Sequence, residues 1–150
     1  STSSSSATIP ITLSCLKKNF ALKDIVASFT VPLGATINMD GTSLYQAVAA
    51  VFICQALAFD ITFSDQLTKD LTALLASIGT AAVPSAGTET LALILGSVGL
   101  PLDAIGLILA VDRILDMIRT AVNVCGDAAV SCIVGKSENE FDQEVFYSKN

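Results

Sequence analysis

Long runs without a charged side chain dominate the chain, and they predict where its helices lie. Residues 25–39 and 41–59 are uncharged and are separated only by Asp40. As an α-helix, residues 41–59 would rise about 28 Å, close to the roughly 30 Å hydrocarbon thickness of a bilayer. The string NMDGT, which contains Asp40 and Gly41, interrupts this apolar stretch. The pattern therefore predicts a broken membrane helix over about residues 24–59.

A second pair of uncharged runs predicts a hairpin that enters the membrane without crossing it. Residues 71–88 and 90–102 lie on either side of Glu89. Glycine and proline interrupt the first run in the string SIGTAAVPSAGT, and these residues end helices. Because each arm is too short for a comfortable span, we expect a re-entrant helical hairpin over about residues 67–101. Two ordinary core helices joined by a loop are the alternative.

The two ends of the chain complete the predicted arrangement. The opening string SSSSATIPITLSCL is typical of a serine-rich linker or of the second arm of another re-entrant hairpin, over about residues 1–20. Its apolar, periodic continuation favours the hairpin arm. The last apolar stretch, about 104–135, would extend about 48 Å and is expected to form a long C-terminal transmembrane helix. Residues 137–150 are polar, and we expect them to be a disordered tail.

The lysine positions predict how these segments are oriented. Lys17, Lys18 and Lys23 lie between the first hairpin arm and the broken helix, and positive residues favour the cytoplasmic side. Following the spans from that turn leaves the C-terminal tail in the cytoplasm. The first residue is Ser1, within a serine-rich stretch, so we expect the 150 residues to be part of a longer chain. We expect that chain to be a multi-pass protein of the plasma membrane, in contact with lipid.

We expect an all-α membrane fold class, and the composition suits a chain whose solvent is partly lipid, with a tightly packed soluble helical domain as the alternative. Of the residues, 52% are hydrophobic and only 15% are charged, whereas average globular domains carry about 25% charge. The net charge of −6 and the absence of a basic patch argue against a nucleic-acid partner. The chain has no histidine, which excludes Ser-His and Cys-His catalytic pairs and the usual zinc sites. The four cysteines form no CxxC motif and lie in or beside apolar runs, so we expect buried side chains without disulfides.

The polar side chains of the last helix share one face. At 100° per residue, those that fall within one arc of about 80° are Asp112, Asp116, Arg119, Asn123 and Asp127. Ionised side chains at the centre of a bilayer cost a few kcal/mol each, so they face a polar cavity or one another. We therefore expect this stripe to line a cavity, with Asp116 and Arg119 paired at i, i+3. A structural salt-bridge seam between helices is the alternative.

The groups near the helix break indicate a cation site. Asn38 and Asp40 at the break, together with Asn123 and Asp127, would supply amide, carboxylate and unwound main-chain oxygens. Hard cations favour oxygen ligands, and broken helices supply them in secondary transporters. A guanidinium at the same depth, such as that of Arg119, grips a carboxylate in bidentate fashion. The combination predicts a cation-coupled carrier of a small acid.

Four strings of the sequence also carry a family resemblance. In chain order they are SSSSATIP, SFTVPLGATINMDGTSLYQAVA, SIGTAAVPSAGTETLALILGSVGLP and AVDRILDMIRTAVNVCGDA. They resemble the sodium-dependent glutamate/aspartate transporters, the sodium:dicarboxylate symporter family that includes the excitatory amino acid transporters. The resemblance covers about residues 1–136 and implies the C-terminal part of the transport domain. It also implies scaffold helices upstream and a homotrimer when the protein is full length.

The resemblance implies a set of site residues. Those implied to hold sodium, the transported coupling ion, are Gly34, Thr36, Asn38, Asp40, Ser77, Ile78, Thr80, Asn123 and Asp127. Those implied to bind L-glutamate or L-aspartate are Ser5, Thr42, Val83, Gly87, Asp116, Arg119, Thr120 and Asn123. Arg119 would bind the side-chain carboxylate and Asp116 the amino group. Because relatives that carry neutral amino acids lack this arginine, the resemblance favours an acidic substrate.

The function that the resemblance implies is sodium-coupled symport of acidic amino acids by alternating access, with the second hairpin as a gate. Carriage of neutral amino acids or C4-dicarboxylates in the same family, or a channel-like subunit that transports nothing, are the alternatives. We expect no enzyme activity. An intramembrane aspartyl protease would need two facing carboxylates and a GxGD string, and the string is absent from the sequence.

Overall fold

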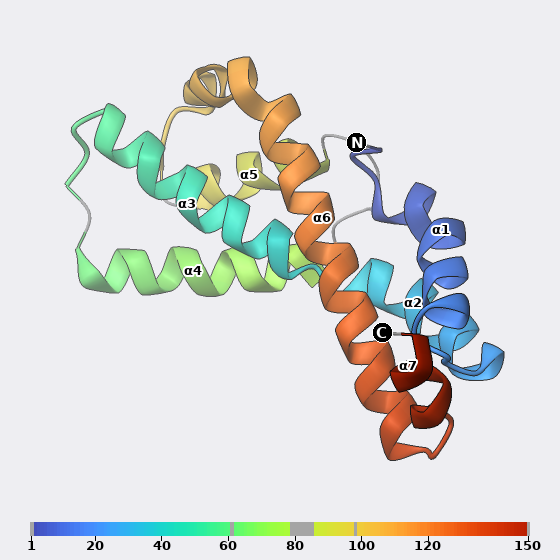
Figure 1. Cartoon of the computed structure of the whole chain (residues 1–150). Coiled ribbons are helices and arrows are strands. Elements are labelled where there is room, and N and C mark those ends of the chain that lie inside the picture. Colours follow the sequence, from blue (N-terminus) through green and yellow to red (C-terminus); the bar gives the residue numbers. More distant parts are fainter. Residues whose placement is uncertain (1, 61, 79–85, 98, 150) are drawn as a thin grey trace.

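The chain folds into packed helices in the computed structural model, and its described residues contain no β-strand (Figure 1). The structure describes residues 2–60, 62–78, 86–97 and 99–149. In chain order, the elements are α1 (Ser5–Lys18), α2 (Asp24–Ile37), α3 (Asp40–Ala56), α4 (Phe63–Ile78), α5 (Ala86–Ser97), the 3-10 helix η1 (Leu102–Ile105), α6 (Gly106–Ser137) and α7 (Gln143–Lys149). The all-helical class predicted from the sequence is confirmed.

Helix α6 is the element on which the other helices are arranged. It has 32 residues and contacts α1, α2, α3 and η1. Helices α4 and α5 pack on α3, which crosses α6, and Figure 1 shows α1 and α2 beside the second half of α6. The first group encloses a core that includes Ile53, Leu91 and Ile94, and the second encloses Leu16 and Val31. Two apolar cores are thus joined by one long helix.

The apolar stretch at 24–59 is divided into α2 and α3 at the position where the pattern predicts a break. Asn38 and Met39 lie outside both helices, with φ, ψ of −100°, 65° and −103°, 55°. Asparagine side chains compete with helical backbone hydrogen bonds. Here the Asn38 amide donates to Asp127 on α6, while the Thr42 and Ser43 N–H groups donate to the Met39 carbonyl and begin α3. The break therefore brings the ends of both helices to α6.

The two arms predicted for the second hairpin correspond to α4 and α5, which pack against each other and against α3. The tip between them, at 79–85, lies outside the described residues. By length and hydropathy, no helix in the ranges that the structure describes can cross a membrane. The long helix expected at 104–135 does form, as α6, and this finding applies to it as well.

Large apolar side chains cover the outer faces of the helices. Ile25 and Phe29 on α2 are 74% and 69% exposed, and Ile133 on α6 is 68% exposed. Cys15 and Cys125 lie on such outward faces and are themselves exposed. The expectation that every cysteine is buried is therefore wrong: Cys54 is buried and Cys132 is half-buried, and no disulfide joins the cysteines in the part of the chain that the structure describes.

The segment after α6 is folded, which corrects the expectation of a disordered tail. It turns back so that Phe141 forms a β-bridge with Leu22, in the connection between α1 and α2. The Phe146 ring of α7 then stacks on Phe20, and it also contacts the Phe141 ring. The tail is polar on average, but these two phenylalanines give it enough apolar contact to dock.

Removing the Phe146 ring should release the tail. Phe146→Ala deletes contacts whose ring centroids are 5.8 Å and 5.5 Å apart. Each aromatic pair is worth about 0.5–1.5 kcal/mol beyond the area that it buries. We expect the amides of residues 138–149 to exchange hydrogen faster while those of α3 are unchanged, as measured by mass spectrometry. Glu144→Ala, at an exposed position of α7, is the control. Unaltered exchange in Phe146→Ala would contradict the docked tail.

Candidate functional site

The polar stripe predicted on α6 is buried, and the apolar side of the same helix is exposed. Its residues are Asp112 (9% exposed), Asp116 (2%), Arg119 (7%), Asn123 (4%) and Asp127 (3%). By contrast, Ile114 and Ile118 are 60% and 58% exposed. The predicted arc is confirmed. The buried and exposed faces of α6 are therefore the reverse of those of a surface helix in a soluble protein, whose polar face is exposed to water.

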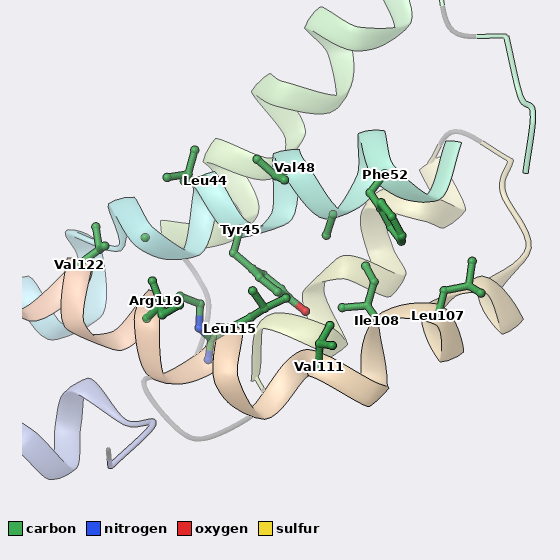
Figure 2. A pocket seen from close by; sticks show the side chains of 13 residues that line it. Leu44, Tyr45, Val48, Phe52, Leu107, Ile108, Val111, Leu115, Arg119 and Val122 are labelled. Atoms are coloured by element: carbon green, nitrogen blue, oxygen red, sulfur yellow. The ribbon is translucent and has the colours of Figure 1, made fainter. Parts of the chain in front are cut away.

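A groove of about 500 Å³ lies between α3 and α6 (Figure 2). Its walls are mostly apolar and include Leu44, Phe52 and Val111, while Arg119 is the charged residue among those lining it. Such a lining suits hydrocarbon far better than a dicarboxylate, whose two charges would need polar partners. The candidate site is therefore the buried polar cluster beside this groove.

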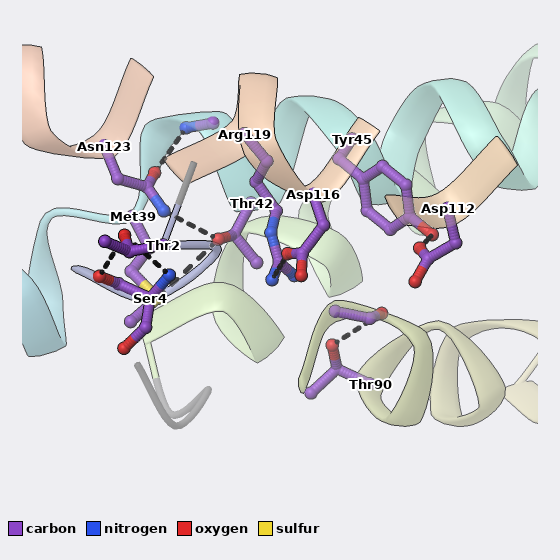
Figure 3. Close-up of polar contacts among 12 residues, drawn as sticks. Thr2, Ser4, Met39, Thr42, Tyr45, Thr90, Asp112, Asp116, Arg119 and Asn123 are labelled. Carbon is purple, nitrogen blue, oxygen red and sulfur yellow. Dashed lines mark hydrogen bonds and ion pairs between the residues drawn. The ribbon is translucent and has the colours of Figure 1, made fainter. Parts of the chain in front are cut away.

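Arg119 pairs with Asp116 at the centre of the stripe (Figure 3). Its guanidinium donates to the Asp116 carboxylate, three residues earlier on α6, and its central carbon lies 5.7 Å from the centroid of the Tyr45 ring. Gly87, at the start of α5, is buried against the guanidinium, so a side chain there would collide with it. The Arg119 Nε is buried without a hydrogen-bond partner among the described residues. A buried cation next to α5 thus retains an unused donor.

Asn123 fastens the start of α3 to α6. Its Oδ1 accepts a hydrogen bond from the Gly41 N–H at 2.8 Å, and its Nδ2 donates to Thr42 Oγ1 at 3.1 Å. The first N–H groups of a helix lack acceptors within the helix, and Asn123 supplies one from outside. Gly41 is needed at this crossing because any Cβ would collide with the Arg119 carbonyl.

Asp127 meets the end of α2. Its Oδ1 accepts a hydrogen bond from Asn38 Nδ2 at 3.2 Å, and Gly34, one turn earlier on α2, packs against the same carboxylate. A Cβ at Gly126 would lie 3.0 Å from Asn38 Nδ2 and 3.3 Å from an Asp40 carboxylate oxygen. The polar groups of Asn38, Asp40 and Asp127 therefore gather at the break between α2 and α3.

The other predicted site residues lie at different depths. Ser5, Ser77 and Thr120 are buried. The side chains of Thr36 and Ile78 are exposed, but it is their main-chain carbonyls that the resemblance implies as ligands. Thr80 and Val83 lie outside the described residues.

Two interactions at the site involve residues that the sequence analysis does not single out. The Tyr45 hydroxyl donates to Asp112 Oδ1 at 2.8 Å. Gln46, which is 0% exposed, donates to Thr90 Oγ1, and Thr90 donates in turn to the Gly87 carbonyl at 3.1 Å. A polar residue inside an apolar run, such as Gln46, indicates a buried polar partner. The sequence does not indicate which helix supplies that partner.

The site offers two kinds of recognition at its two ends. Around Arg119, a buried guanidinium can bind a carboxylate. Around Asp127, amide and carboxylate oxygens lie beside the carbonyls of an interrupted helix, which are ligands for hard cations. The described residues contain no group of three or more His, Cys, Asp or Glu side chains arranged for a metal ion. A cation at Asp127 would therefore draw its ligands from main-chain and amide oxygens as well.

Gly34 should not tolerate a side chain. A Cβ there would stand 2.5 Å from Asp127 Oδ1, so Gly34→Ala must displace the carboxylate that accepts from Asn38. Because overpacking costs about 1–3 kcal/mol, the purified protein should unfold at a lower temperature. Gly96→Ala is the matched control, since a Cβ there meets nothing within 4 Å. Equal melting temperatures for the two variants would contradict the close packing of α2 on α6.

Comparison with known proteins adds the family to this geometry. The family model of the sodium:dicarboxylate symporters matches residues 1–137. Over 133 residues, the chain is 55% identical to an excitatory amino acid transporter of Caenorhabditis elegans, 54% to one of Onchocerca volvulus and 53% to excitatory amino acid transporter 1 of Homo sapiens. Each alignment covers 89% of this chain but 26%, 27% and 24% of the respective relative, so the chain spans about a quarter of their length. The chain belongs to the sodium:dicarboxylate symporter family.

Proposed function

We propose that the protein is a sodium-coupled symporter of acidic amino acids, L-glutamate or L-aspartate, that works by alternating access. The observation that carries the proposal is the buried Arg119 guanidinium, which pairs with Asp116 and whose Nε donor has no acceptor within the described part of the chain. A buried cation with spare hydrogen-bonding capacity suits an anionic ligand. Excitatory amino acid transporters are among its relatives, which supports a glutamate-like ligand.

The Asp116–Arg119 pair suggests how such a substrate is recognised. An acidic amino acid carries an ammonium group and a side-chain carboxylate, so it can offer each partner of the ion pair an opposite charge. In the proposal, Arg119 binds the side-chain carboxylate with support from Thr42, and Asp116 binds the amino group. The residues proposed to hold the α-carboxylate and to close over it are Ser5, Val83, Gly87, Thr120 and Asn123.

Sodium is proposed to bind along the break between α2 and α3. One ion would use the carbonyls of Gly34, Asn38 and Asn123 with the Asp127 carboxylate. A second would use the carbonyls of Thr36, Ser77, Ile78 and Thr80. A third would use the side chains of Asn38 and Asp40, together with ligands from other parts of the protein. The gathering of Asn38, Asp40 and Asp127 around Gly126 supports this assignment.

The proposal also assigns roles to whole elements. The hairpin of α4 and α5 would act as a gate, because Gly87, in the first turn of its α5 arm, lies against the Arg119 guanidinium. The exposed apolar faces, including Ile25, Phe29 and Ile133, would face lipid or other membrane segments of the protein. We place the protein in the plasma membrane as a multi-pass homotrimer, with its C-terminus in the cytoplasm.

Arg119→Ala should abolish efficient uptake of acidic amino acids. Removing one partner of a buried charge pair costs about 2–5 kcal/mol, so the KM for L-aspartate should rise about thirty-fold or more. Initial rates of radiolabelled aspartate uptake by the full-length protein in proteoliposomes measure this change. Arg113→Ala removes an exposed arginine on the same helix and should leave the KM within about two-fold. An unchanged KM in Arg119→Ala would refute the assignment, and uptake of neutral amino acids alone would favour the neutral-substrate alternative.

Asp127→Asn should weaken sodium activation of uptake. The substitution removes the negative charge but keeps a similar shape, so the sodium concentration for half-maximal uptake should rise about ten-fold or more. Aspartate uptake at several sodium concentrations measures it, and Asp103→Asn, an exposed acid in η1, is the control. If uptake by the unmodified protein does not depend on a sodium gradient, sodium coupling is wrong. Ion flux that does not saturate with aspartate would indicate a channel instead.

A further inference from the structure

Helices α2 and α6 run antiparallel in a fixed register, and their polar contacts recur once per turn. Thr30 on α2 meets Ser131 on α6, and one turn further along, Gly34 meets Asp127. Another turn along α2, Asn38 donates to the same Asp127. Successive positions four residues apart on α2 thus meet Ser131, then Asp127, and then Asp127 again on α6. The contact between Thr30 and Ser131 is therefore one turn away from the proposed sodium ligands.

The Thr30–Ser131 contact is a short hydrogen bond between the two helices, which joins a half-buried threonine to a fully buried serine. Their hydroxyl oxygens are 2.7 Å apart, and Ser131 is 0% exposed. Ser131 Oγ also lies 2.7 Å from the Asp127 main-chain carbonyl, and Thr30 Oγ1 lies 2.8 Å from the Val26 carbonyl. The hydroxyl groups of Thr30 and Ser131 have two protons between them, and these must be shared among three short O···O contacts. If Thr30 donates to Ser131, Ser131 can donate to the Asp127 carbonyl, which links α2 to the peptide group of Asp127.

The other contacts of this register are poorly suited to hold it while an ion binds. Gly34 has no side chain and contributes only close packing. The Asn38–Asp127 hydrogen bond uses a carboxylate oxygen that a bound cation would also claim. An ion on that oxygen would compete with the Asn38 amide for the same lone pairs and weaken the hydrogen bond. A link that takes no part in binding is then needed to keep α2 and α6 aligned.

We propose that Thr30 and Ser131 are positioning residues for the sodium site at Asp127. The inference deepens the proposed function and rests on it. The hydroxyl pair holds α2 against α6 one turn from the site, so that the Gly34 and Asn38 carbonyls stay at the spacing that the Asp127 carboxylate needs. The pair does not touch the ion, and it acts through the register of the two helices.

Thr30→Val and Ser131→Ala test this role, because each removes a hydroxyl with little change in shape. A buried hydrogen bond contributes about 0.5–1.5 kcal/mol, so the sodium concentration for half-maximal aspartate uptake should rise about two- to ten-fold. The aspartate KM at saturating sodium should stay within about two-fold, because the Arg119 end of the site is unaltered. The double variant should shift no further than the larger single shift, since both substitutions break the same link.

Thr12→Val is the matched control. Thr12 is a buried threonine on α1 whose hydroxyl donates to the Thr8 carbonyl of its own helix at 3.1 Å. It should leave the sodium dependence unchanged. Thr30→Ser keeps a hydroxyl and should restore most of the sodium affinity lost in Thr30→Val, which a loss of packing alone would not predict. If an apolar variant does not assemble, Ser131→Cys, with a weaker donor of similar shape, must show a smaller shift in the same direction.

Several outcomes overturn the inference. Unchanged sodium dependence in Thr30→Val and Ser131→Ala, additive shifts in the double variant, or an equal shift in Thr12→Val would each exclude a specific positioning role. These failures are distinct from failure of the proposed function. If the unmodified protein takes up aspartate in a sodium-dependent way while the hydroxyl variants behave like it, the function stands and only the positioning role is lost.

Discussion

The burial of ionised side chains along one face of α6 is the constraint on which the rest of the structure depends. A charge removed from water costs several kcal/mol unless a partner compensates for it. Arg119 compensates Asp116 on the same helix, the Tyr45 hydroxyl of α3 compensates Asp112, and the Asn38 amide at the end of α2 compensates Asp127. The positions of α2 and α3 therefore follow from where the stripe needs donors.

Glycines allow these donors to come close enough. Gly34 and Gly126 leave room for polar groups of the facing segment beside Asp127, and Gly41 lets the start of α3 touch the α6 backbone. Gly87 lets the start of α5 approach the Arg119 guanidinium. Glycine is therefore required in NMDGT and CGD because the facing segment leaves little room for a side chain, and not because a turn forms there. A side chain at any of these positions would push a polar group away from its partner.

Local features of this fold could be predicted from the sequence, and contacts between distant segments could not. The arc of Asp112, Asp116 and Arg119 follows from the α-helical repeat alone, and the break follows from one polar string in an apolar run. The hydrophobic periodicity of the sequence does not show which helix packs against Gln46. The hydrogen bond from Gln46 to Thr90 therefore could not be predicted from the sequence. The average polarity of residues 137–150 predicts a disordered tail because it conceals Phe141 and Phe146, whose docking partners lie more than a hundred residues earlier. Residue types alone indicate a cation site and a carboxylate site, whereas the role of each individual residue is implied by the family resemblance.

The ion pair of Asp116 and Arg119 has a consequence for a carrier that must reset itself after each cycle. An empty binding pocket travels back through a medium of low permittivity, where any uncompensated charge raises the barrier steeply. In the proposed carrier, the two residues would neutralise each other while no substrate is bound, so the empty pocket would return without a counter-ion for either one. A bound acidic amino acid would then replace each residue's partner with its own carboxylate and ammonium groups, so the pair would add no net charge in either direction of the proposed cycle.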